Sequence, residues 1–305
     1  APDFRSTLHE RYRRLRELAP VHLTPNGVVR LTRYADVQRL LKQVPAGVRT
    51  LGGSLPGDDE SLVPRRFMLD QDPPDHTRLR KLVRHGFTPG AMRRLHTRIE
   101  EITDELLDRV QGNNEIELVS ALAQPLPATV ICELLGVDPS DRERFVDWTT
   151  DMTYALLGDL ASDQQRSKAQ LSMMKLAQYF QQLFAARVGG DGEDLISTLL
   201  HAEEDGESLT REELLWQCMG LLLAGFETTT GLIANGVRQL LQHPEQLEKL
   251  RSEPEHMDSA IEECLRFDGP IAATARVLHA DAEFGGQRFT TDMRMIAVLA
   301  AANRD

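Results

Sequence analysis

The residues with the clearest potential for chemistry lie in the segment Leu221–Thr230, which reads Leu-Leu-Leu-Ala-Gly-Phe-Glu-Thr-Thr-Thr. It sets a glycine (Gly225), an acid (Glu227) and three threonines beginning at Thr228 beside a run of leucines. A buried glutamate costs stability unless it has a partner, and glycine weakens a helix by about 1 kcal/mol. We therefore expect a helix that tolerates both at its centre to be built around a functional site.

A second group of candidates follows Asp72-Pro-Pro-Asp75, where His76 and Arg80 lie four residues apart. On a helix they share one face, and such a pair can clamp an anion. The same stretch is strongly basic, since it also carries Arg78, Lys81 and Arg84. A solvated charged face gives the same pattern, so spacing alone leaves both interpretations open.

The third group is Glu263 and Arg266, three residues apart shortly before Pro270. By itself, such a pair is an ordinary intrahelical salt bridge worth a few tenths of a kcal/mol.

The element that must position the first group is an unusually long helix. Thr210 and Glu213 have the spacing of a capping box, and Pro244 is the first residue that must stop the helix. The pattern between them covers about 33 residues, roughly 50 Å at the helical rise, or about three times the average helix.

Helical periodicity accounts for most of the remaining chain, and strand-like patterns are confined to its two ends. We expect one domain over residues 1–305 that is mainly α with a minor β part. Helices are expected at about 4–18, 34–42, 75–85, 91–112, 125–135, 139–158, 164–188, 193–202, 245–251 and 258–267. Strands are expected around the Pro-Asn-Gly turn of 21–31, at 275–278, as a hairpin at 283–289, and at 293–301.

Composition narrows the function classes. The formal net charge of -12 argues against a nucleic-acid-binding role. The longest near-apolar run, Met219–Phe226, is too short to span a bilayer, and no secretory signal opens the chain. The three cysteines (Cys132, Cys218 and Cys264) are far apart, as expected for buried free thiols in a reducing cytosol. These features predict a soluble, cytoplasmic protein.

Several common catalytic motifs are missing from the sequence: G-x-S-x-G, a phosphate loop, H-E-x-x-H and paired C-x-x-C. The one Glu-x-x-His match of the type that di-iron bundles use, Glu253-Pro-Glu-His256, contains a proline at a helix start. We therefore reject a di-iron site.

Taken in order, the three groups resemble a known family. Asp-Pro-Pro-Asp followed by His76-Thr-Arg-Leu-Arg80, Ala224-Gly-Phe-Glu-Thr228 within a long helix, and Glu263-Cys-Leu-Arg266 before a proline are similar to bacterial soluble cytochrome P-450 proteins. Ala273-Thr-Ala-Arg276 and Ala301-Ala-Asn-Arg-Asp305 extend the resemblance over essentially the whole chain. The family consists of haem-thiolate monooxygenases.

The resemblance implies a cytochrome P-450 fold, haem b (iron protoporphyrin IX) as the cofactor, and a role for each motif residue. Ala224 and Gly225 would pass over the distal face of the haem, Thr228 would hydrogen-bond the dioxygen bound there, and Glu227 would relay protons from solvent. The remaining roles are haem propionate binding for His76, Arg80 and Arg276, a structural charge pair for Glu263 and Arg266, and substrate contact for Phe226, Ile271, Ala272 and Ala273.

The implied reaction inserts one oxygen atom from dioxygen into a small hydrophobic substrate, as a hydroxylation or an epoxidation. Electrons would come from NAD(P)H through ferredoxin reductase and ferredoxin, and the basic face of Arg78, Lys81 and Arg84 would help an acidic donor to dock. The protein would act as a monomer. The substrate walls would also include 45–64, 152–157 and 171–180.

The main departure from the family is the axial ligand. The family holds iron through a cysteine in a glycine-rich loop downstream of the Ala-Asn-Arg-Asp segment. None of the three cysteines stands in such a loop, so no metal ligand is expected within this chain, and the axial cysteine is expected after Asp305. The apolar run Ile296–Ala302 resembles an inner strand that would be poorly supported at a chain end. We therefore expect the chain to be an N-terminal portion of a longer protein.

An alternative function is a haem-free relative that keeps the fold and activates another biosynthetic enzyme. Absence of the cysteine loop suits this alternative. Retention of Glu227, Thr228, His76 and Arg80 does not, because a protein without haem has no need of them.

Overall fold

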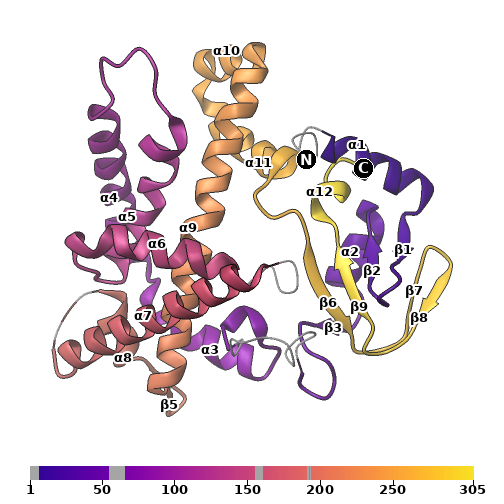
Figure 1. The fold of residues 1–305 in the computed structure, drawn as a ribbon, viewed down its shortest axis with the longest axis horizontal. Coiled ribbons are helices and arrows are strands. Elements are labelled where there is room, and N and C mark those ends of the chain that lie inside the picture. The colour runs from indigo at the N-terminus through magenta and orange to yellow at the C-terminus, as the bar shows by residue number, and fades with distance from the viewer. Residues whose placement is uncertain (1–6, 55–65, 155–160, 191, 193) are drawn as a thin grey trace. The chain divides into compact units, whose positions relative to one another are not determined.

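The computed structural model describes residues 7–54, 66–154, 161–190, 192 and 194–305 (Figure 1). The chain divides into two compact units, one formed by residues 1–56 and 231–305 and the other by residues 57–230. We call these the N/C unit and the middle unit. Within the described residues the architecture is mainly helical with small sheets, as the sequence predicts.

The long helix α9 (Arg211–Gln242) contributes its first part to the middle unit and its last part to the N/C unit. Its start is a reciprocal capping box, because the Thr210 amide donates to Glu213 Oε2 at 2.8 Å and the Glu213 amide donates to Thr210 Oγ1 at 3.1 Å. The predicted helix is thus confirmed, together with its cap.

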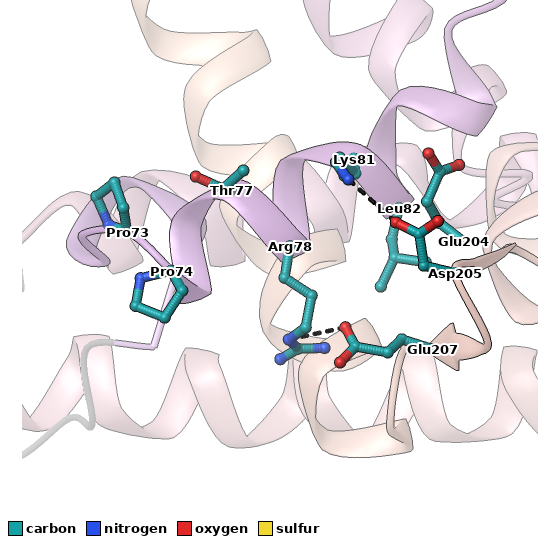
Figure 2. Close-up of a pocket in the computed structure, with 9 residues that line it drawn as sticks. All are labelled: Pro73, Pro74, Thr77, Arg78, Lys81, Leu82, Glu204, Asp205 and Glu207. Carbon is teal, nitrogen blue, oxygen red and sulfur yellow. Dashed lines mark hydrogen bonds and ion pairs between the residues drawn. The ribbon is translucent and has the colours of Figure 1, made fainter.

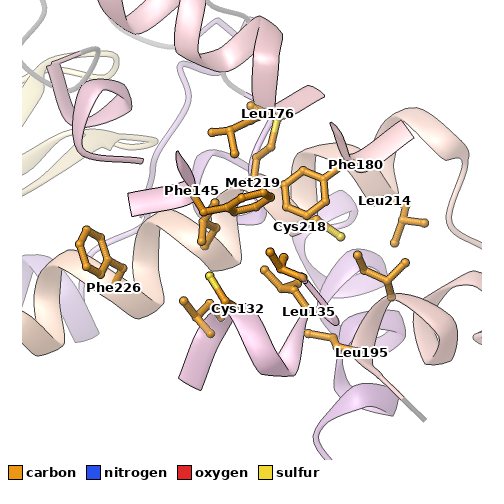
Figure 3. Packing of buried hydrophobic residues seen from close by; sticks show 14 of the residues in the cluster. Cys132, Leu135, Phe145, Leu176, Phe180, Leu195, Leu214, Cys218, Met219 and Phe226 are labelled. Atoms are coloured by element: carbon orange, nitrogen blue, oxygen red, sulfur yellow. The ribbon is translucent and has the colours of Figure 1, made fainter. Parts of the chain in front are cut away.

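The middle unit is a helical assembly around one apolar core. Its helices and short helical turns are η2 (Met68–Asp70), α3 (Asp75–Val83), η3 (Arg84–Gly86), α4 (Pro89–Asp108), η4 (Val119–Ala123), α5 (Pro125–Leu134), η5 (Pro139–Asp141), α6 (Arg142–Thr153), α7 (Asp163–Arg187) and α8 (Leu195–Leu200). A small hairpin, β4 (Glu203–Glu204) and β5 (Glu207–Ser208), precedes α9. Figure 3 shows the core, in which Phe145 and Phe180 pack edge to face with ring centroids 5.7 Å apart.

The N/C unit is built on a five-stranded sheet in the order β1-β2-β9-β6-β3. Its strands are β1 (Val21–Leu23), β2 (Val29–Leu31), β3 (Ala46–Gly47), β6 (Thr274–Leu278) and β9 (Arg294–Ala297), with a separate hairpin of β7 (Ala282–Phe284) and β8 (Gln287–Phe289). Its helices, besides the end of α9, are α1 (Leu8–Leu18), α2 (Tyr34–Lys42), α10 (Pro244–Ser252), η7 (Pro254–His256), α11 (Met257–Asp268) and α12 (Leu299–Ala302). A second apolar core, which includes Leu31, Leu278 and Met295, packs on this sheet.

Two expectations about the last strand are wrong. The apolar run Ile296–Ala302 is not one strand, because β9 ends at Ala297 and Leu299–Ala302 forms the helical turn α12. The strand is also well supported, since β9 pairs in parallel with β2 on one side and antiparallel with β6 on the other. Helix α3 begins at Asp75, and Pro74 before it provides no side-chain cap.

Candidate functional site

The glycines of α9 in the middle unit lie where other segments approach the helix closely. A Cβ on Gly220 would lie 2.9 Å from Phe67, and a Cβ on Gly225 would lie 3.2 Å from Cδ1 of Ile131 on α5. Contacts this short are tighter than ordinary van der Waals packing. Close packing of α9 against α5 is therefore sufficient to explain a glycine at position 225.

The last part of α9 repeats this pattern within the N/C unit. A Cβ on Gly231 would lie 3.1 Å from Pro270, and one on Gly236 would lie 3.4 Å from Sγ of Cys264 on α11. At these four positions a glycine thus stands where a neighbouring segment contacts α9.

The charged side chain at the polar centre of α9 is not buried. Glu227 is exposed and has no hydrogen bond or ion pair within the described residues, so no partner is needed to offset desolvation. Ala224 is also exposed, whereas Phe226 is buried in the core with 2% of its surface accessible. The expected cost of a buried glutamate therefore does not arise.

Thr228 has a defined hydroxyl orientation. Its Oγ1 donates to the carbonyl of Ala224 at 2.7 Å, and Thr230 donates in the same way to the carbonyl of Phe226 at 3.0 Å. A hydroxyl has one hydrogen to donate and two lone pairs. With its hydrogen directed to Ala224, Thr228 presents its lone pairs as hydrogen-bond acceptors.

The basic segment α3–η3 divides into paired and unpaired cations. His76, which is half-buried, and Arg80, which is exposed, have no ion pair or side-chain hydrogen bond within the described residues. The other four basic residues all face carboxylates: Arg78, Lys81, Arg84 and His85. His76 and Arg80 are therefore the two basic side chains of this segment that have no carboxylate partner among the described residues, and both can donate hydrogen bonds to an anion.

The most buried of these pairs joins α3 to the start of α9. Arg78 hydrogen-bonds to Glu213, and both side chains are about a quarter exposed. Burial raises the pKa of Glu213, but hydrogen bonds from Arg78 and Thr210 outweigh it, so that the pKa lies below its usual value. The Arg78 cation is correspondingly stabilised, and its pKa is raised.

Within the N/C unit, Glu263 and Arg266 on α11 form a bidentate pair with both N···O distances at 2.7 Å. The remaining Arg266 nitrogen donates to the carbonyl of Asn303. The pair therefore ties α11 to the Ala-Asn-Arg-Asp segment at the end of the chain.

Arg276 on β6 also has no carboxylate partner within the described residues. Its Nη1 donates to Thr274 Oγ1 at 3.1 Å and to the carbonyl of Ala275 at 2.6 Å. The preceding residues 271–273 are exposed. His76 and Arg80 belong to the middle unit and Arg276 to the N/C unit.

The cysteines are poorly suited to bind a metal. Burial raises the pKa of the Cys132 thiol to about 11 and that of Cys218 further still, and it also raises the pKa of the half-buried Cys264. A thiol must lose its proton to act as a ligand. No group of three or more potential ligand residues occurs among the described residues.

The expected substrate walls are only partly described. Residues 55–64 of the loop 45–64 and residues 155–157 of the segment 152–157 lie outside the described residues. In the stretch 171–180 of α7, Leu171 and Met174 are exposed, whereas Phe180 is fully buried.

The feature that sequence reasoning missed is the acidic hairpin β4–β5 opposite α3. It carries Glu204, Asp205 and Glu207, which face Arg84, Lys81 and Arg78. The basic side chains that were expected to help an acidic donor to dock therefore already have carboxylate neighbours within the chain. The Asp205-Gly206 dipeptide, typical of a two-residue hairpin turn, was the available signal.

The chain is similar in sequence to known proteins over nearly its whole length. The family model described as Cytochrome P450 matches residues 3–305. The chain is 39% identical to cytochrome P450 107B1 of Saccharopolyspora erythraea, over 99% of this chain and 76% of that protein. It is also 39% identical to vitamin D(3) 25-hydroxylase of Pseudonocardia autotrophica, over 97% of this chain and 73% of that protein.

Among solved structures, P450BioI in complex with an acyl carrier protein ligated to hexadec-9Z-enoic acid has a TM-score of 0.88 and 34% identity. The match covers 100% of this chain and 80% of that one. No helix of the described residues is long and apolar enough to cross a membrane.

Proposed function

The chain belongs to the cytochrome P450 family of monooxygenases, and from this premise we propose that it holds haem b and oxygenates a small hydrophobic substrate. One atom of dioxygen enters the substrate, as a hydroxyl group or an epoxide, and the other leaves as water. Two electrons and two protons balance the reaction. The electrons come from NAD(P)H through ferredoxin reductase and ferredoxin.

The observation that carries the proposal is the distribution of charge on α3. Four of the six basic residues of α3 and η3 face carboxylates, whereas His76 and Arg80 lie one turn apart without a partner among the described residues. Haem propionates are carboxylates, and a cation without a carboxylate partner is suited to bind them. His76 and Arg80 therefore fit the group, and the proposal assigns them to the propionates. The same role is proposed for Arg276, which also lacks a carboxylate partner among the described residues.

When bound, haem supplies the site at which dioxygen is reduced and activated. The chain's own contribution is to admit substrate and to move protons. Ala224 is the small, exposed residue proposed to leave room beside α9, and Gly225, which packs against Ile131, lets α9 lie close to α5. Glu227 is exposed and unpaired, which suits a carboxylate that takes protons from solvent and passes them inward.

Thr228 Oγ1 is proposed to lie on the path along which protons reach the site. Its hydroxyl hydrogen is held by the Ala224 carbonyl at 2.7 Å, so its lone pairs accept a hydrogen bond from a water or a protonated oxygen beside the helix. A threonine in this orientation would position a proton donor beside the helix.

The other residues support the site or shape its substrate. Glu263 and Arg266 act as a structural charge pair through their bond to the Asn303 carbonyl. Residues 271–273, which are exposed, are proposed to contact substrate. Phe226 is buried in the core of the middle unit, so it is proposed to support the site from within that core. The name of one relative, vitamin D(3) 25-hydroxylase, supports hydroxylation of an apolar substrate.

The proposal places the thiolate ligand of the iron outside the three cysteines of this chain. Cys132 and Cys218 are buried thiols with raised pKa values, and Cys264 packs against Gly236. The proposal further describes a monomeric, cytoplasmic protein that does not bind nucleic acid, in line with its net charge of -12.

Titration of the chain with haemin, followed by Soret absorbance, tests the haem assignment. We expect saturable binding at one haemin per chain that disappears when the chain is unfolded in urea. Equal uptake by the folded and the unfolded chain would show that the haemin association is nonspecific. A folded chain that takes up no haemin would contradict the assignment of His76 and Arg80 to the propionates.

A further inference from the structure

The hairpin β4–β5 places a row of carboxylates against the basic side of α3 and η3. Lys81 Nζ lies 3.1 Å from Asp205 Oδ2, and Arg78 Nε lies 3.8 Å from Glu207 Oε2. Figure 2 shows these side chains reaching toward one another from the helix and from the hairpin. Glu204 lies 3.7 Å from Arg84 and 2.9 Å from His85. The hairpin thus supplies an internal carboxylate to each of these basic side chains.

The base of the hairpin is fixed by packing in the middle unit. A Cβ on Gly86, the last residue of η3, would lie 1.9 Å from Leu195 Cδ1, so η3 and α8 are in direct contact. The hairpin follows α8 after two residues. On its other side it leads into α9, where Glu213 holds Arg78. The acidic residues are therefore kept beside α3 by the fold and not by their charges alone.

The outer ion pairs are weak enough to be exchanged. Lys81 is 46% exposed and Asp205 is 78% exposed. The pairs of Arg84 with Glu204 and of Arg78 with Glu207 are too long for hydrogen bonds. An ion pair this exposed shifts an equilibrium by at most about fivefold. A cavity of about 590 Å³ lies between the helix and the hairpin, so another carboxylate has room to enter.

We propose that the hairpin is an intramolecular competitor for an acidic partner protein at the basic side of α3. This rests on the proposed function, in which an acidic electron donor delivers electrons to the protein. Carboxylates of the donor replace Glu204, Asp205 and Glu207 as the partners of Arg78, Lys81 and Arg84. The exchange conserves the number of ion pairs, so the donor binds more weakly than it would to an uncovered face and leaves faster.

The test removes the three carboxylates and keeps the shape of the hairpin, in the variant Glu204→Gln/Asp205→Asn/Glu207→Gln. Asparagine tolerates the left-handed backbone of Asp205, whose φ is 56°. The probe is a [2Fe–2S] ferredoxin of net negative charge, titrated into the chain by calorimetry at low salt, about 10 mM, where charges are least screened. Each basic side chain that is freed from its carboxylate should raise the ferredoxin affinity about twofold. The triple variant should therefore bind ferredoxin about tenfold more tightly than wild type. Its salt dependence should also be steeper.

The matched control adds the same charge elsewhere in the middle unit, through Asp104→Asn/Asp108→Asn/Glu115→Gln. These residues are exposed at the far end of α4 and the following segment, and their side chains have no ion pair within the described residues. We expect less than about a twofold change in ferredoxin affinity. An increase equal to that of the hairpin variant would mean that net charge alone is responsible, and would overturn the inference.

A third variant, Arg78→Gln/Lys81→Gln/Arg84→Gln, separates the inference from the proposed function. If it weakens ferredoxin binding while the hairpin variant leaves binding unchanged, α3 binds the donor but the hairpin is not a competitor. If neither variant changes the affinity, the donor does not dock on α3. That result refutes both donor docking at α3 and competition by the hairpin. The single substitution Asp205→Asn, at the most exposed acid, repeats the test with the least change to the fold and should give about a twofold gain.

Discussion

The contact between Gly86 and Leu195 gives a prediction whose size follows from the structure. A methyl group added by Gly86→Ala would lie 1.9 Å from Leu195 Cδ1, well inside van der Waals contact. Leu195 is 2% exposed and belongs to the core, so it has little room to move. We expect Gly86→Ala to lower the free energy of unfolding by about 1–3 kcal/mol, the usual cost of overpacking.

A second substitution, on the other side of the same contact, tests whether the two side chains occupy the same space. Leu195→Ala alone leaves a cavity and should cost about 2–5 kcal/mol. In the double variant the new methyl group enters the space that the leucine has left. The double variant should therefore be more stable than the sum of the two single effects predicts, by about 1 kcal/mol or more.

Urea unfolding, followed by far-ultraviolet circular dichroism, measures all three variants. Gly90→Ala is the matched control, because the nearest atom to its new Cβ would be Arg94 Nη1 at 3.9 Å. It should be neutral or slightly stabilising, by up to about 1 kcal/mol. Additive effects in the Gly86 and Leu195 double variant would refute the close contact between η3 and α8.

Two further predictions concern ionisation. The pKa of Glu213 is lowered in the folded chain, so its ionised form stabilises the fold above the unfolded-state pKa, and this contribution is lost as the pH falls through the lower, folded-state pKa. Glu213→Gln should therefore be less stable than wild type at neutral pH, with a difference in unfolding free energy that shrinks in acid; a constant difference would contradict the pairing with Arg78. The buried thiols of Cys132 and Cys218 should resist an aromatic disulfide reagent in the native chain, Cys264 should react slowly, and all three should react in denaturant; rapid native labelling of Cys132 would contradict its burial.

Local signals in the sequence predict most of the helices and the first hairpin. Thr210 and Glu213 predict the start of α9, because a capping box is formed by residues that are close in sequence. The turn at Gly27, whose φ is 77°, likewise separates β1 and β2 as expected. Features of this kind depend on backbone chemistry within a few residues.

The end of the chain shows where local patterns fail. The apolar run from Ile296 to Ala302 contains a strand and a helical turn, which a short apolar stretch does not distinguish. The central position of β9 in its sheet depends on pairing with β2, which lies more than two hundred residues earlier. The spacing of residues in the sequence does not reveal a strand pairing over such a distance along the chain.

The candidate site divides in the same way. Spacing placed His76 and Arg80 on one face of a helix but left open whether they were solvated or bound an anion. The structure adds that Arg78, Lys81 and Arg84 are paired, which sets the first two apart. Partners that come from a hairpin more than a hundred residues away are visible only once the chain is folded.

The measurement that tests the central claim most directly is the haemin affinity of His76→Ala/Arg80→Leu, compared with wild type and with the control His96→Ala/Arg94→Leu on α4. Each double variant removes one histidine and one arginine from a helix of the middle unit, and Arg94 and His96 are exposed. If His76 and Arg80 bind the propionates, their loss should weaken haemin binding about tenfold or more, since each charge-assisted hydrogen bond contributes about 1.5–3 kcal/mol, while the control stays near wild type. Equal affinities for all three proteins would contradict the assignment of α3 to the haem.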